Sequence, residues 1–319
     1  TSPKFDSVKD IFTSLLANLD AAMGMMDNGG LNGDILFGGN MNGWRVMANT
    51  IKMRIALRMA DVDSSTASSV FNSAYNSGVI SSGGDLHYPY LTSDAFDNPW
   101  QDRFQTRYDF VVSEKFIDHL KATGDPRLPY MADGTAISNG TEYVGLEYGL
   151  ENPGILETLL SGIDGRIIYD GTQQGGWIAT YSEVCFAMAE AYERGWTTVG
   201  DTQTWLRLGV QSSCERWGVS SAAAAAYANS ITVGSNAMES IAMEKWVDMF
   251  LQGYESWTEW RRLDYPVLSP PAAAITGTGV PVRNGYGGLV PTQNKASYDA
   301  AVAAQGPDNQ DTKLWWDTK

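Results

Sequence analysis

Cysteine and histidine are scarce in this sequence of 319 residues, which has two of each. Cys185 lies in an apolar helical pattern and Cys214 in a polar one, so a buried free thiol and an ordinary second thiol are favoured over a disulfide. His87 and His119 do not stand at metal-ligand spacing from the cysteines, so we expect no structural zinc site. The acidic run at 27–34 lacks the spacing of an EF-hand loop, and only a structural calcium ion of another kind stays open as a cofactor.

Basic residues and long apolar runs are also few. Lysine and arginine together number 22 against 37 acids, which gives a formal net charge of −15. This balance opposes binding to nucleic acid or to anionic lipid, because both depend on basic side chains that displace counterions. No apolar run has the length of a membrane span, and no secretory signal pattern occurs.

Helical periodicity is present near both ends of the chain, and no composition shift divides it, so we expect a single domain over 1–319. Apolar residues recur at three- and four-residue spacing over residues 5–26, 44–59, 64–75, 108–122, 181–194, 201–217, 222–230 and 237–262. Arg54 and Arg58 stand within the apolar side of the second pattern. Because buried arginines need partners, we predict ion pairs with core glutamates such as Glu183 or Glu190.

Two tracts, at about 78–107 and 130–177, have no such period. A structureless stretch of about thirty residues inside a compact domain is uncommon unless it has a function. Both tracts mix aromatic and hydrogen-bonding residues with glycines. The sequence therefore predicts a rigid helical scaffold that presents a loop-rich ligand-binding face.

The composition of these tracts fits a sugar ligand. A sugar offers C–H faces to flat rings and hydroxyls to amide, carboxylate and guanidinium groups. The residues that we predict to contact the ligand are Tyr90, Asn98, Trp100, Gln101, Tyr148, Arg166, Tyr169 and Trp177. A glycoside hydrolase is the alternative, because 37 acids make some close carboxylate pair inevitable, although sequence gives no distance between them.

Residues 244–266 concentrate tryptophan and charge, but their spacing is that of a scaffold. Trp246 and Phe250 stand one turn apart on one face, and Gly253 interrupts the pattern. Pro266 ends it, because the residue before a proline is driven out of the α region. We interpret this segment as helices in which Glu and Arg side chains pair beneath indole rings.

Several segments, in order along nearly the whole chain, resemble the SusD/RagB family of outer-membrane lipoproteins in its SusD-like nutrient-binding branch. The tryptophan–arginine helix and the double tryptophan near the end of the chain are specific as a set. The matching segments are Gly43–Arg58, Asp125-Pro126-Arg127, Glu183–Ala191, residues 244–266, Pro281-Val282-Arg283 and Thr312-Lys313-Leu314-Trp315-Trp316-Asp317.

The resemblance implies a predominantly α-helical fold of tetratricopeptide-like helix pairs with a loop-rich ligand-binding face. It also implies a non-catalytic protein exposed at the outer membrane, which binds a glycan or similar nutrient for import through a TonB-dependent SusC-like porin. A lid of such a porin for a peptide nutrient is a further alternative. Family members begin with a lipidated cysteine and further N-terminal helices, so this sequence looks N-terminally truncated and we expect no lipid anchor in it.

Overall fold

The structure is a computed structural model that describes residues 3–27, 29–151, 153–169, 176–274 and 279–319. Residues 152 and 170–175, which belong to the second predicted tract, lie outside the described residues. Helices dominate the fold, and the sheet within the described ranges is a two-stranded antiparallel ribbon. The predicted predominantly α-helical architecture is confirmed.

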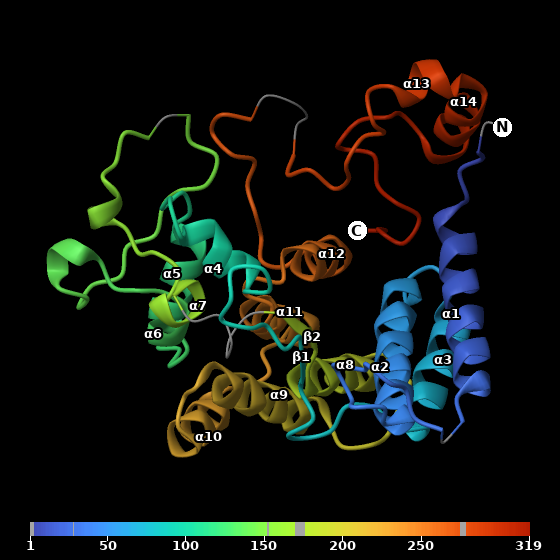
Figure 1. Cartoon of the computed structure of the whole chain (residues 1–319), viewed down its shortest axis with the longest axis horizontal. Helices are drawn as coiled ribbons and strands as arrows, with labels where there is room; N and C mark the ends of the chain where they lie inside the picture. The colour runs from blue at the N-terminus through green and yellow to red at the C-terminus, as the bar shows by residue number, and fades with distance from the viewer. Residues whose placement is uncertain (1–2, 28, 152, 170–175, 275–278) are drawn as a thin grey trace.

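Eight helices of the described residues build the scaffold. They are α1 (Val8–Met25), α2 (Met41–Met59), α3 (Ser64–Asn76), α8 (Tyr181–Glu193), α9 (Thr202–Trp217), α10 (Ser221–Ser230), α11 (Ala237–Asp248) and α12 (Gly253–Leu263). Consecutive helices pack side by side, α2 with α3 and α8 with α9, in the manner of tetratricopeptide pairs. In Figure 1, α1–α3 form one flank of the molecule and α8–α10 its base.

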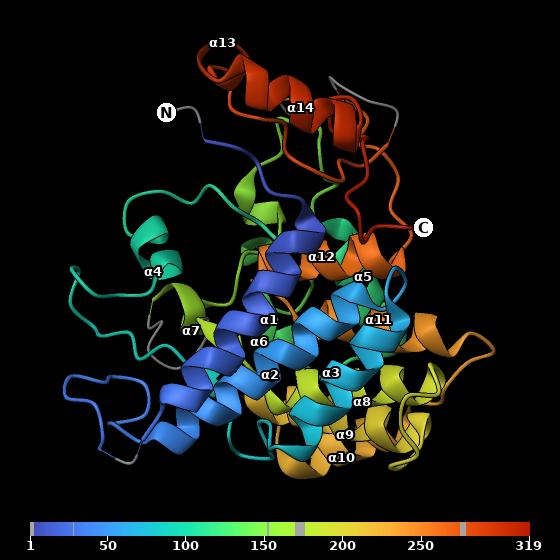
Figure 2. The same cartoon turned by 90° about the vertical axis from the view of Figure 1, so that its right-hand side faces the viewer.

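Shorter elements lie within the tracts, between them and in the C-terminal part. They are β1 (Leu86–His87), α4 (Pro99–Phe104), α5 (Glu114–Thr123), α6 (Leu128–Met131), the 3₁₀ turns Ala136–Ser138 and Glu157–Leu159, α7 (Gly165–Ile168), β2 (Trp177–Ala179), α13 (Val290–Gln293) and α14 (Lys295–Gln305). The elements α4 and α7 lie side by side on the flank opposite α1–α3, which Figure 1 and Figure 2 show from two directions.

Two predicted helices need correction. The helix predicted over 108–122 begins only at Glu114, because residues 111–113 pair with other loops in an extended conformation. The pattern over 237–262 is two helices, and the break starts before Gly253, since α11 ends at Asp248. Leu251 adopts a left-handed conformation in the break (φ 67°), and Phe250 stacks on Phe116 at 4.8 Å between ring centroids. Packing of these side chains in the core ends α11 there.

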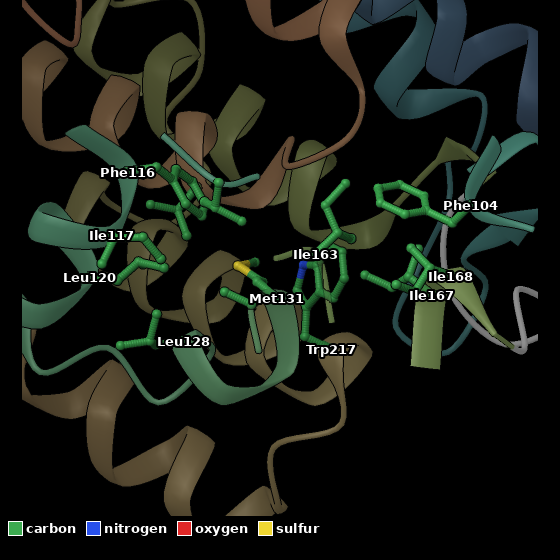
Figure 3. Packing of buried hydrophobic residues seen from close by; sticks show 13 residues of the cluster. Phe104, Phe116, Ile117, Leu120, Leu128, Met131, Ile163, Ile167, Ile168 and Trp217 are labelled. Carbon is green, nitrogen blue, oxygen red and sulfur yellow. The ribbon is translucent and has the colours of Figure 1, made fainter. Parts of the chain in front are cut away.

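A core cluster anchors the tract elements to the scaffold. In Figure 3, Met131 and Trp217 lie at its centre, with Phe104 and Ile168 to one side and Phe116 to the other. Each of these residues is less than 10% exposed. The short helices α4, α6 and α7 are therefore held by buried apolar contacts, so the loops that they carry have a fixed base.

The arginines of α2 have the predicted kind of partner. Arg54 donates from Nε and Nη2 to the two carboxylate oxygens of Glu183 at 2.7 and 2.8 Å. Arg58 pairs with Glu255 on α12. Both thiols are buried and free, as the sequence indicated for Cys185. The ion pairs join α2, α8 and α12, so they belong to the scaffold.

A second and more deeply buried ion network confirms that residues 244–266 are scaffold. Arg262 donates from Nη2 to Glu190 at 2.7 Å and to Glu259 at 2.6 Å. Lys245 also pairs with Glu259, and all four side chains are less than 10% exposed. The network connects α8, α11 and α12 through charge-assisted hydrogen bonds.

This network predicts a loss of stability in acid. Burial alone raises the pKa of Glu190, but the Arg262 guanidinium outweighs it and holds that pKa at about 2, below its ordinary 4.5. The pKa of Glu259 is lowered in the same way. A carboxyl group with a lowered pKa in the folded state stabilises the fold above its unfolded pKa, and this contribution is lost as the pH falls toward the folded pKa.

Urea denaturation followed by circular dichroism at a series of pH values measures this effect. We expect the free energy of unfolding to fall between about pH 4.5 and pH 2. The Glu190→Gln variant serves as comparison, and its free energy of unfolding should change less with pH in that range. Equal slopes for the two proteins would contradict the assignment to this network.

Candidate functional site

The two tracts meet first at the ribbon of β1 and β2. His87 pairs with Trp177 across the ribbon, and their ring centroids are 4.8 Å apart. The ring of Tyr90 lies 6.3 Å from that of His87. Gly176 permits this arrangement, since a Cβ at that position would lie 2.4 Å from Cε2 of Tyr90. The structure thus brings Tyr90 and Trp177, predicted from different tracts, into one neighbourhood.

Trp177 also covers a buried ion pair. The guanidinium of Arg216 lies 5.0 Å from the Trp177 ring centroid, and its Nη2 lies 2.5 Å from Oδ1 of Asp248. Asp248 accepts a further hydrogen bond from the hydroxyl of Ser182 at 2.9 Å. One side of the indole is therefore engaged by the scaffold through a cation–π contact.

The second junction of the tracts is formed by α4 and α7. Asn98 is 1% exposed, and its Oδ1 accepts from the backbone N–H of Trp100 at 2.9 Å as the N-cap of α4. Trp100 is partly buried and meets Phe110 edge to face at 5.9 Å. Gln101 is partly exposed on the first turn of α4. Asn98 hence supports the helix that presents Trp100 and Gln101.

An aromatic surface lies over this junction, and we define it by Trp100, Tyr108, Phe110 and Tyr169. Tyr108 and Phe110 are 36% and 38% exposed, and Tyr169, at the end of α7, is 69% exposed. Buried Phe104 supports the surface from below, with ring centroids 5.0 Å from Tyr108 and 6.2 Å from Phe110. Exposed rings on a packed base offer flat apolar faces to a ligand.

Carboxylates border the aromatic surface. Burial raises the pKa of Tyr108 to about 12, and Asp133 adds to the rise. Tyr169 and Glu157 act in the same direction, which places these groups near the Tyr108 hydroxyl. That hydroxyl packs directly on Gly162, where a Cβ would lie 1.8 Å from it. The rings are therefore fixed in position next to hydrogen-bond acceptors.

Arg166 is held by its own neighbours. Its Nε and Nη2 donate to the two carboxylate oxygens of Asp164 at 2.7 and 2.8 Å, and Nη2 also donates to the Pro129 carbonyl at 2.8 Å. The guanidinium lies 4.5 Å from the ring centroid of Tyr130. Its charge is thus compensated by Asp164. A second guanidinium, that of Arg103, lies 5.2 Å from the ring centroid of Phe110.

Tyr148 belongs to a different neighbourhood. Its hydroxyl donates to the Ser269 carbonyl and accepts from the Ser269 N–H at 3.2 Å. It therefore joins the second tract to the loop after α12. Among the described residues, no group of three or more His, Cys, Asp or Glu side chains could hold a metal ion.

Sequence reasoning missed Tyr108 and Phe110, because it assigned both to a helix. The backbone N–H of Val112 donates instead to the Ser161 carbonyl at 2.9 Å, which keeps this segment extended. The two consecutive valines at 111 and 112 favour an extended conformation, and Ser113 before Glu114 is a usual helix start. These signals could have placed the boundary correctly.

Comparison with known proteins identifies the family. Residues 1–287 match the model of the SusD-like family that is described as "Starch-binding associating with outer membrane". The chain belongs to this SusD-like family. The resemblance of the sequence to the SusD-like family is confirmed. Members of the family are binding proteins and not catalysts, so this SusD-like protein is not an enzyme.

Solved structures agree on the fold of the SusD-like chain. A chitin-binding protein is 26% identical, with a TM-score of 0.86 over 100% of this chain and 74% of its own. A SusD homologue from Bacteroides fragilis NCTC 9343 is 23% identical, with a TM-score of 0.88 over 100% of this chain and 77% of its own. A SusD homologue from Bacteroides thetaiotaomicron VPI-5482 is 24% identical, with a TM-score of 0.85 over 99% of this chain and 76% of its own. No curated protein matches the sequence.

The family is associated with the outer membrane. No helix within the part of the chain that the structure describes is both long and apolar enough to cross a membrane.

Proposed function

We propose that this SusD-like protein acts as a single surface-exposed domain that binds a glycan at the outer membrane and delivers it to a TonB-dependent SusC-like porin. The aromatic surface carries this proposal. Its rings come from both tracts and from the segment between them, and buried Phe104 supports Tyr108 and Phe110. Family membership supports the same conclusion, because the family is described as starch-binding.

Within this proposal, Trp100 and Tyr169 stack on sugar rings together with Tyr108 and Phe110, and Gln101 offers an amide to sugar hydroxyls. Arg166 orients the α7 end of the surface through its pair with Asp164. Asn98 acts as the cap of α4. Tyr90 and Trp177 extend the binding face along the β1–β2 ribbon, since their rings flank His87.

The acidic border of the surface predicts which glycans bind. Asp133 and Glu157 lie near Tyr108, and the charge of Arg166 is compensated by Asp164. The Arg103 guanidinium over Phe110 sets one positive charge against the two carboxylates near Tyr108. We expect a neutral oligosaccharide to bind about tenfold more tightly than a uronic-acid oligosaccharide of equal length, a difference of about 1.4 kcal/mol. The preference should weaken as salt is added, because salt screens repulsion between exposed charges.

Titration calorimetry with a panel tests both the function and this preference. The panel contains maltohexaose and chitohexaose as neutral glycans, hexagalacturonate as an anionic one, and a mixed oligopeptide. Heat from at least one neutral glycan supports the proposal. Heat from the peptide alone would replace it with a peptide-nutrient function, and tighter binding of hexagalacturonate would overturn the charge argument.

A further inference from the structure

We propose a second sugar-binding site on this chain, in an open pocket of about 530 Å³ against one face of α5, which we term the α5 pocket. This inference rests on the proposed glycan function. The pocket is bounded by α5, by residues 147–148 of the second tract and by residues 269–271 of the loop after α12. Its volume falls in the range of small-ligand sites in proteins, about 300–1,000 Å³.

The outer wall of the α5 pocket is fixed by contacts between two distant loops. Tyr148 exchanges hydrogen bonds with both backbone groups of Ser269, and the Ala273 N–H donates to the Gly149 carbonyl at 3.2 Å. Gly149 has φ 70°, and a Cβ there would lie 2.1 Å from Cβ of Pro271. The close approach requires glycine, and it sets the Tyr148 ring and the prolines in a defined place.

The inner wall is fixed in the same way. The backbone N–H of Glu114, at the start of α5, donates to the Leu146 carbonyl at 2.8 Å. A Cβ on Gly145 would lie 2.3 Å from Cα of Glu114, so the loop before Glu147 lies directly on the helix. Both walls of the pocket are thus preorganised, which lowers the entropy lost when a ligand binds.

The lining combines the two kinds of group that a sugar needs. Tyr148, Pro270 and Pro271 provide flat or rigid apolar surface. Ala122 and Ser269 also line the pocket, and the hydrogen-bonding side chains on α5 and at residue 147 are Glu114, Lys115, Asp118, His119 and Glu147. Carboxylates accept from sugar hydroxyls, while ring C–H groups pack on Tyr148.

The charge of the lining residues further restricts which sugars the pocket can bind. Three carboxylates, those of Glu114, Asp118 and Glu147, line the pocket together with one ammonium group, that of Lys115. Burial lowers the pKa of His119 below its ordinary 6.5, so its imidazole is neutral at pH 7. The pocket therefore takes a neutral or amine-bearing sugar in preference to an acidic one. None of its lining residues belongs to the aromatic surface, so the two sites are separate.

Calorimetry with a trisaccharide, maltotriose or chitotriose, tests the second site, because a short glycan can occupy each site independently. We expect binding at two sites per chain. Ala122→Trp fills the α5 pocket from an exposed position on the helix, and the double variant Asp118→Ala/Glu147→Ala removes two acceptors. Each should abolish one of the two sites, and Tyr169→Ala should weaken the other.

Glu142→Ala is the matched control, because Glu142 is an exposed carboxylate of the same tract that does not line the pocket. It should leave both sites intact. A single site that Ala122→Trp and the double variant leave unchanged would overturn the second site while the proposed function stands. No heat from any glycan would overturn both. Loss of all binding in Ala122→Trp, with no effect of Tyr169→Ala, would make the α5 pocket the main glycan site.

Discussion

Arg262→Leu should lower the free energy of unfolding by about 3–5 kcal/mol, because it leaves buried carboxylates without their cation. Arg262 is essentially inaccessible and donates to both Glu190 and Glu259, which belong to α8 and α12. A leucine at this position cannot donate to either. Chemical denaturation at pH 7, followed by far-ultraviolet circular dichroism, measures the difference from the unmodified protein.

Arg107→Leu provides the matched control. Arg107 also pairs with a carboxylate, that of Asp109, but its side chain is 73% exposed. Exposed ion pairs contribute little because water already solvates both charges, so we expect a change within about 0.5 kcal/mol. If the two variants lost equal stability, the buried network would not be what joins α8 to α12.

The helical scaffold was largely predictable from sequence, because its signals are local. The pattern over 181–194 gave α8 (Tyr181–Glu193), and that over 64–75 gave α3 (Ser64–Asn76), both within two residues at each end. Periodicity and capping residues act within a few turns of chain. The pairing of Arg54 with a core glutamate was also predictable, because a buried arginine requires a nearby acid.

The boundaries that failed depend on distant residues. The helix predicted from residue 108 does not form there, because Val112 hydrogen-bonds to Ser161, nearly fifty positions later. The break after Asp248 depends on Phe250 stacking on Phe116, on another helix. The contact of Tyr148 with Ser269, in the loop after α12, joins residues that are 121 positions apart. A single sequence does not show which distant segments of the chain contact each other.

The roles of single residues within the two tracts could not be predicted from the sequence. Asn98 and Trp100 are two positions apart, but one is buried as a cap and the other lies in the aromatic surface. Composition cannot distinguish an exposed ring from a buried one, because both environments favour aromatic residues. The ligand contacts of the eight predicted residues stay predictions.

The double variant Tyr108→Ala/Tyr169→Ala should weaken glycan binding at the aromatic surface about 100-fold, or about 2.7 kcal/mol. Each ring loses its stacking on a sugar, and stacked aromatic contacts are among the main sources of affinity in such sites. The measurement is calorimetry with maltohexaose or chitohexaose in the Ala122→Trp background, so that the α5 pocket does not contribute heat. Tyr192→Ala, which removes a 37% exposed tyrosine from α8, should bind as well as that background.

Single variants separate loss of binding from loss of structure. Tyr169 is 69% exposed, so Tyr169→Ala should leave the denaturation midpoint unchanged and still lower the affinity about tenfold. Tyr108→Phe keeps the ring and removes the hydroxyl that packs on Gly162, so it should retain most of the affinity if stacking is the main contribution. Full affinity in the double variant would show that the glycan binds elsewhere. If each variant lost affinity only to the extent that it lost thermal stability, Tyr108 and Tyr169 would be packing residues. The loss of a ligand contact on an exposed ring must lower the affinity without unfolding the chain.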